Sequence, residues 1–152
     1  MKNIFKIFSL IFILFLVGCK KEEIIICNIK VNNDVQNYNM VGTYKIYHND
    51  NYVTNIEKEE KYKSDNIDMI DYFYESKKLE YSNLNDIYGG ITYEVSNTDN
   101  SVDLNIVIDT KNLDIKKMVK NNYIDKDYVI SNKLTTSGLI KIYESKGAIC
   151  NI

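Results

Sequence analysis

Apolar and polar residues alternate along much of the chain, in short segments separated by stretches rich in Asn and Asp. Residues 24–31, 38–47 and 52–62 are three such segments. A period of two residues is typical of β-strands that bury one face. Turn-forming residues at 32–34 and 48–51 separate them, so this part of the chain predicts an antiparallel meander of three strands.

The second half of the third segment, residues 57–61, is charged on both faces. Charge on both faces suits an edge strand, because it discourages pairing with strands of other molecules. We therefore expect residues 52–62 at an exposed edge of the sheet or beyond its rim.

The apolar spacing then changes to three and four residues, which is typical of a helix. It predicts a helix over residues 66–83 that begins at a run of polar capping residues and packs an aromatic stripe on the sheet. The residues on this stripe are Ile67, Ile70, Tyr74, Tyr81 and Leu84, with Phe73 beside them.

Residues 91–95 and 102–108 alternate again around a turn at 97–100, which predicts a hairpin with one buried face. A short helix is expected from Asn112 to Asn121. The last helix is expected to start at a Thr135 or Thr136 cap and to end before Gly147, with a short strand after it. The predicted fold class is α+β: an antiparallel sheet of about five strands with helices packed on one face, in a single domain over residues 24–152.

The front of the chain has a different pattern. Lys2 and Lys6 flank the start of residues 7–17, which are apolar except for one Ser. A membrane-spanning helix needs about 20 apolar residues, so this run is typical of a secretory signal peptide. It ends in Leu16-Val17-Gly18-Cys19, which resembles the lipobox of bacterial lipoprotein precursors.

This resemblance implies that residues 1–18 are a signal peptide cleaved between Gly18 and Cys19. It implies that the Cys19 sulfur carries a diacylglycerol and that residues 19–23 are a short tether. The alternatives are a cleaved signal without lipid and a retained anchor. We expect the protein to be lipid-anchored to the cell membrane on its extracytoplasmic face.

Cys27 and Cys150 remain, near the two ends of the predicted domain. Conditions outside the membrane permit a disulfide between them, and two separate buried thiols are the alternative. We favour the disulfide, because these two cysteines are the ones left over and both lie in apolar segments.

The charge and composition exclude some classes of partner. The chain has 19 basic and 21 acidic residues, and a mildly acidic chain without a basic cluster does not attract nucleic acid. The basic residues other than His48 are all Lys, and Asn, Ile and Tyr are abundant. This bias fits the AT-rich genome of a bacterium better than a functional demand.

No residue pattern points to catalysis, a metal or a cofactor. His48 lies in a predicted turn, where a lone His is usually solvated. The sequence motifs of serine hydrolases, zinc proteases and thioredoxin-like proteins are absent. Asp99, Ser101 and Asp103 loosely resemble a calcium loop, but its glycine and its bidentate Glu are missing. We expect a protein that is not an enzyme.

Several short patches occur in one order along the chain: Cys27-Asn28-Ile29, Gly42-Thr43-Tyr44, Tyr52-Val53-Thr54, Tyr88-Gly89-Gly90, Ile108-Asp109 and residues 142–148. Together they are similar to the small bacterial lipoproteins related to YehR, a family of unknown function. The resemblance implies an α+β fold with helices on one side of an antiparallel sheet, and cysteines at positions 27 and 150. It implies no activity and no catalytic residues.

The sequence thus predicts a membrane-anchored surface lipoprotein of unknown molecular function. We expect a binding or interaction module that contacts an envelope protein or a small ligand through its loops or the polar sheet face. The alternative is a small cell-envelope enzyme that acts on glycans through two carboxyl groups about 5–10 Å apart. A solute-binding transporter subunit is disfavoured, because the chain is too short for two lobes.

Overall fold

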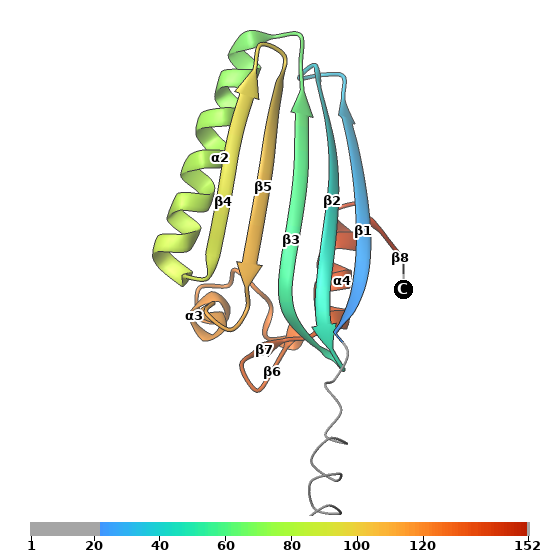
Figure 1. The fold of residues 1–152 in the computed structure, drawn as a ribbon, viewed down its shortest axis with the longest axis vertical. Helices are drawn as coiled ribbons and strands as arrows, with labels where there is room; N and C mark the ends of the chain where they lie inside the picture. The colour runs from blue at the N-terminus through green and yellow to red at the C-terminus, as the bar shows by residue number, and fades with distance from the viewer. Residues whose placement is uncertain (1–21, 152) are drawn as a thin grey trace, which may run out of the picture.

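The computed structural model describes residues 22–151. The predicted signal peptide, its cleavage site and Cys19 lie outside these residues. A six-stranded antiparallel sheet, in the order β4-β5-β3-β2-β1-β8, forms one layer, and the helices pack against one of its faces (Figure 1). The predicted α+β fold class is confirmed.

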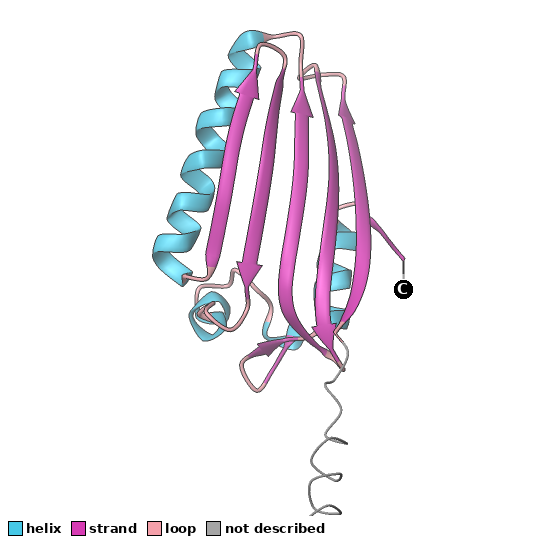
Figure 2. Cartoon of the chain, in the orientation of Figure 1, coloured by secondary structure: helices cyan, strands magenta, loops and turns pink. Residues whose placement is uncertain are grey.

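Figure 2 shows the strands in magenta and the helices in cyan. The sheet contains β1 (Glu23–Asn33), β2 (Tyr38–Asn49), β3 (Tyr52–Lys63), β4 (Ile91–Thr98), β5 (Ser101–Asp109) and β8 (Ile149–Asn151). The helices are α2 (Ile67–Tyr88), α3 (Ile115–Lys120), α4 (Thr136–Ser145) and the 3-10 turn η1 (Lys126–Tyr128). A separate small hairpin is formed by β6 (Val129–Ile130) and β7 (Lys133–Leu134).

The charged strand β3 lies inside the sheet, between β2 and β5, so the prediction of an edge strand is wrong. The charges on its outer face are paired with neighbouring strands: Lys45 Nζ lies 3.1 Å from a Glu59 carboxylate oxygen. Likewise, Lys61 Nζ lies 2.8 Å from the carboxylate of Asp103. Charged residues therefore fit an interior strand here because the strands on both sides supply partners.

Helix α2 runs past residue 83 to Tyr88 and ends at Gly89, which has a positive φ of 69°. Its predicted aromatic face is buried at Phe73 and Tyr81, whereas Ile67 is 52% exposed. Helix α4 starts at the Thr135 cap, whose hydroxyl accepts a hydrogen bond from the Gly138 N–H. Helix α3 starts later than predicted, because Asp114 is its cap in place of Asn112.

The core is divided between the two long helices. One cluster lies between α4 and strands β1, β2 and β3, and it includes Ile25, Ile46 and Leu139. Two smaller clusters lie beneath α2, around Phe73 and around Tyr81. The middle strand β3 contributes to the α4 cluster and to one of the α2 clusters, so it runs along the boundary between the two parts of the core.

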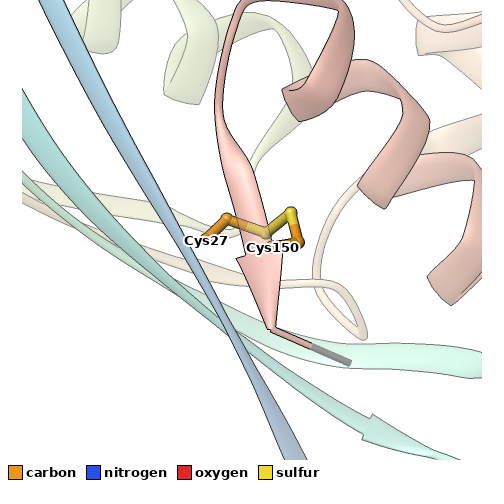
Figure 3. Close-up of a disulfide and its surroundings, with 2 residues drawn as sticks. All are labelled: Cys27 and Cys150. Atoms are coloured by element: carbon orange, nitrogen blue, oxygen red, sulfur yellow. A yellow bond between two sulfur atoms is a disulfide. The ribbon is translucent and has the colours of Figure 1, made fainter.

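A disulfide joins Cys27 to Cys150 and fixes the short strand β8 against β1 (Figure 3). The two cysteines are 123 positions apart in sequence and face each other across the two strands. Cys27 is fully buried. This pairing matches the one that the sequence favours.

His48 is not the solvated turn residue that its sequence position suggests. It is the penultimate residue of β2 and only 7% exposed. Its Nδ1–H donates a hydrogen bond of 3.0 Å to the carbonyl oxygen of Asp50. Within residues 22–151, no helix is both long and apolar enough to cross a membrane.

Candidate functional site

A buried pair of opposite charges lies at the boundary between the two parts of the core. Lys58 and Glu60 are both on β3, and their side chains are 15% and 5% exposed. The Lys58 Nζ lies 3.2 Å from Oε1 of Glu60. Residues two apart on a strand point to the same face, and this face is the one that the helices cover.

Tyrosine hydroxyl groups complete the environment of this pair. The Tyr44 hydroxyl donates to Glu60 Oε1 at 3.0 Å, and the Tyr62 hydroxyl donates to Oε2 at 2.8 Å. Lys58 Nζ donates to the Tyr81 hydroxyl at 2.9 Å. The ammonium also lies 5.0 Å from the centre of the Tyr44 ring, within the range of a cation–π contact. Glu60 therefore has partners for both oxygens, as a buried carboxylate requires.

Gly42 makes room for this arrangement. It lies on β2 directly opposite Glu60, and a Cβ atom there would come 3.2 Å from the Tyr44 ring and 2.9 Å from a methyl group of Ile29. Because Gly42 has no side chain, the Tyr44 ring has space to lie beside Glu60.

The charged forms of both residues are favoured. Burial by itself would lower the pKa of Lys58, but the charge and hydrogen bond of Glu60, together with Tyr143 and Tyr44, outweigh burial, and the pKa lies above its usual value. Burial would raise the pKa of Glu60, but Lys58 and the hydrogen bonds from Tyr62 and Tyr44 hold it below its usual value. Glu60 is therefore a fixed counter-ion and is poorly suited to donate a proton as a general acid.

A pocket of about 310 Å³ opens beside Lys58, between α2 and α4. We call it the α2–α4 pocket. Its size is at the lower end of the range for small-molecule sites, and it combines apolar walls with a few polar groups, as such sites do. Side chains from α2, α3, α4 and the sheet form its apolar walls: Ile56, Leu84, Ile91, Ile108, Leu113, Met118, Ile124, Leu134, Leu139 and Ile142. The polar residues that line it are Lys58, Glu80, Tyr81, Tyr123, Tyr143 and Lys146.

The outer face of the sheet is the second surface of interest. A shallow hollow of about 650 Å³ lies over β1, β2, β3 and β5. Its charged groups are already paired, as Lys61 is with Asp103, and its polar Thr43 donates to Asn28 at 3.1 Å. Exposed apolar side chains on the same strands include Ile24, Ile26, Val41 and Val107. This is the polar sheet face that the sequence offers for an envelope partner.

Sequence reasoning missed the α2–α4 pocket, because it placed β3 at the sheet edge and therefore placed Lys58 and Glu60 in solvent. The predicted disulfide lies apart from the residues that line the pocket, although β8, which it holds, directly follows α4. Asp103, part of the calcium-like pattern, is paired with Lys61. Among residues 22–151, no group of three or more His, Cys, Asp or Glu side chains is placed to hold a metal ion.

Solved structures that share this fold include the NMR structure of the YehR protein of E. coli. It has a TM-score of 0.57 and 18% sequence identity, and the match covers 88% of this chain and 93% of that chain. The NMR structure of a protein from Streptococcus pneumoniae TIGR4 has a TM-score of 0.50 and 13% identity, with 90% of each chain covered. No family model and no curated protein matches this chain.

At these identities the likeness shows the fold alone. The fold that the YehR resemblance implies is therefore confirmed.

Proposed function

We propose that this protein is a lipid-anchored binding module on the extracytoplasmic face of the cell membrane, and that the α2–α4 pocket holds a small ligand. The observation that carries the binding site is the placement of Lys58 and three tyrosines in an apolar pocket between two helices. A few fixed polar groups within apolar walls give a ligand both binding energy and orientation.

The short distance to the anchor supports a place close to the membrane. Strand β1 begins at Glu23, so Lys20, Lys21 and Glu22 are the residues between it and Cys19. Such a link reaches at most about 14 Å when extended. Figure 1 shows α3, which contributes to the pocket wall, at the same end of the sheet as the start of β1. The pocket would therefore lie toward the membrane.

The ionised, fully hydrogen-bonded carboxylate of Glu60 favours a binding role over the glycan-hydrolysing alternative. Glycoside hydrolysis needs a carboxylic acid with a raised pKa beside a second carboxylate. The pKa of Glu60 is lowered, and both of its oxygens are occupied by Lys58, Tyr44 and Tyr62. A binding role needs no such acid.

The anchor is tested by the intact mass of the protein extracted from its native membrane. We expect the mass of residues 19–152 plus a diacylglycerol, with a gain of two protons on reduction of the disulfide. The mass of the full chain or of an unlipidated chain would contradict the anchor.

The pocket is tested by native mass spectrometry of the same material. We expect a bound small molecule that is lost from the Ile142→Trp variant, because the larger ring fills the pocket that Ile142 lines. Ile149→Trp is the control, since Ile149 is 74% exposed on β8, outside the pocket. A bound molecule that survives Ile142→Trp, or no bound molecule in the wild type, counts against this site.

A further inference from the structure

The α2–α4 pocket contains a hydroxyl group that has no hydrogen-bond partner among the described residues. Tyr143 is 6% exposed and lines the pocket, yet its hydroxyl bonds to none of the residues from 22 to 151. The protein does not enclose this oxygen completely. Because Tyr143 lines the pocket, we place the exposed part of the oxygen in the open space of the pocket. Because buried hydroxyls normally have a partner, this one points to a ligand.

Two more donors lie in the same pocket. Lys58 has three N–H groups, and its partners in the protein are Glu60 and the Tyr81 hydroxyl. Tyr81 accepts that hydrogen bond, which leaves its own proton available. Burial raises the pKa of Tyr143 to about 12, so its hydroxyl remains a donor at neutral pH. The pocket therefore offers several donors and calls for an acceptor oxygen.

The buried charge beside the pocket is already balanced, because Glu60 neutralises Lys58 at 3.2 Å. The other charged residues that line the pocket, Glu80 and Lys146, are exposed to solvent, and Glu80 is paired with Lys77 at 2.8 Å. A ligand with a net charge would have to bury it without a new counter-ion, which is costly. The balanced charge favours an uncharged head group, and the aliphatic walls favour a hydrocarbon chain.

We infer that the α2–α4 pocket binds an uncharged acyl compound, an ester or amide of a fatty acid, whose carbonyl oxygen accepts hydrogen bonds from Tyr143 and Tyr81. Its chain lies against Leu84, Leu139 and Ile142. This inference rests on the proposed binding function of the pocket. The acyl compound is either a lipid of the membrane or a free molecule.

Methyl NMR of methionine reads the pocket directly, because Met118 lines it, whereas Met40 and Met69 pack elsewhere. The full chain is labelled at the methionine methyl groups and placed in nanodiscs of ether-linked lipid, which has no carbonyl group. Methyl hexanoate is then compared with sodium hexanoate and with hexylammonium chloride. We expect the ester to shift the Met118 signal saturably, to leave Met40 and Met69 in place, and to bind more tightly than either charged probe.

Tyr143→Phe removes the hydroxyl of Tyr143 without breaking a hydrogen bond to any of residues 22–151. It should weaken binding of the ester about 3- to 10-fold, the value of one hydrogen bond, whereas the exposed control Tyr72→Phe should not. The acyl inference is overturned if the ester binds Tyr143→Phe as tightly as it binds the wild type, or if a charged probe binds the wild type more tightly than the ester does. Either result would still leave the pocket as a binding site. A Met118 signal that none of the probes moves overturns the binding function itself.

Nanodiscs of ester-linked lipid distinguish the two sources. If the membrane supplies the ligand, the Met118 signal in ester-linked nanodiscs is already shifted before any probe is added. If the signal is the same in both lipids and moves only with methyl hexanoate, the ligand is a free ester. The ligand has the same carbonyl acceptor in either case. Tyr143→Phe should therefore weaken binding of the membrane lipid as well as binding of the free ester.

Discussion

Lys58 and Glu60 stand two positions apart on the central strand β3, and their charged atoms meet inside the core, 3.2 Å apart. Four tyrosines surround or border the pair, at positions 44, 62, 81 and 143. The pair lies where the cluster beneath α4 meets those beneath α2. Neither helix has to cover the charges completely, and the space left between the helices is the α2–α4 pocket.

The first prediction concerns the coupling between the two charges. Glu60→Gln leaves the Lys58 ammonium buried without a counter-ion, which should lower the free energy of unfolding by about 3–5 kcal/mol. Adding Lys58→Met removes that charge, so the double variant should be more stable than Glu60→Gln alone. Urea unfolding followed by circular dichroism measures all the variants. Glu59→Gln on the outer face is the control, with an effect of about 1 kcal/mol or less, and strict additivity would show that the pair is not coupled.

The second prediction concerns acid. The pKa of Glu60 in the folded protein lies below its ordinary value of 4.5, so the carboxylate stabilises the fold above that pH. This stability is lost as the pH falls through the folded pKa. The difference in free energy of unfolding between the wild type and Glu60→Gln should therefore decrease below about pH 4.5. It should stay constant from there to neutral pH. Unfolding midpoints in urea between pH 3 and 7 measure it, and an advantage that grows in acid would contradict the assignment.

The third prediction concerns the space that Gly42 leaves for Tyr44. Gly42→Ala places a methyl group 2.9 Å from Ile29 and 3.2 Å from the Tyr44 ring, so both side chains must give way. Overpacking of this kind costs about 1–3 kcal/mol. We expect this displacement to weaken the hydrogen bond from Tyr44 to Glu60, so Tyr44→Phe should destabilise the Gly42→Ala protein less than it destabilises the wild type. Thermal unfolding of the four proteins tests this, with Thr43→Ala as the outward-facing control.

The fourth prediction concerns the disulfide. The bond between Cys27 and Cys150 closes a loop of 123 positions, which the chain-entropy model values at up to about 5 kcal/mol. The double Ser variant should therefore unfold at lower temperature, and reduction of the wild type should have a similar effect. Cys19→Ser is the control, because position 19 precedes the first strand. An unchanged melting temperature in the absence of the bridge would contradict a structural role.

Much of the fold could be predicted from local patterns. The alternation at Ile25, Cys27 and Ile29 identified β1 and its buried face, because each side chain's face follows from its position in the strand. The cap at Thr135 likewise marked the start of α4. The ends of α2 and α3 were less predictable, since polar residues near a helix end offer more than one cap, as Asn112 and Asp114 do.

The candidate site could not be predicted in the same way. The charges at residues 57–61 suggested an edge strand because, in a single sequence, a charged side chain gives no sign of its partner. In the fold, β2 and β5 flank β3 and bring Lys45 and Asp103 to its outer charges. His48 was misplaced for the same reason, since its burial depends on residues that pack around the end of β2.

By itself, the sequence determined the strand and helix pattern, the fold class and the two cysteines available to pair, because these depend on neighbours along the chain. It also contains the Leu16–Cys19 pattern on which the proposed anchor rests. Only the tertiary structure decided that Lys58 and Glu60 enter the core and that Tyr143 reaches a pocket beside them. Burial and charge pairing are set by strands and helices that are distant in sequence, so only the folded chain brings these groups together.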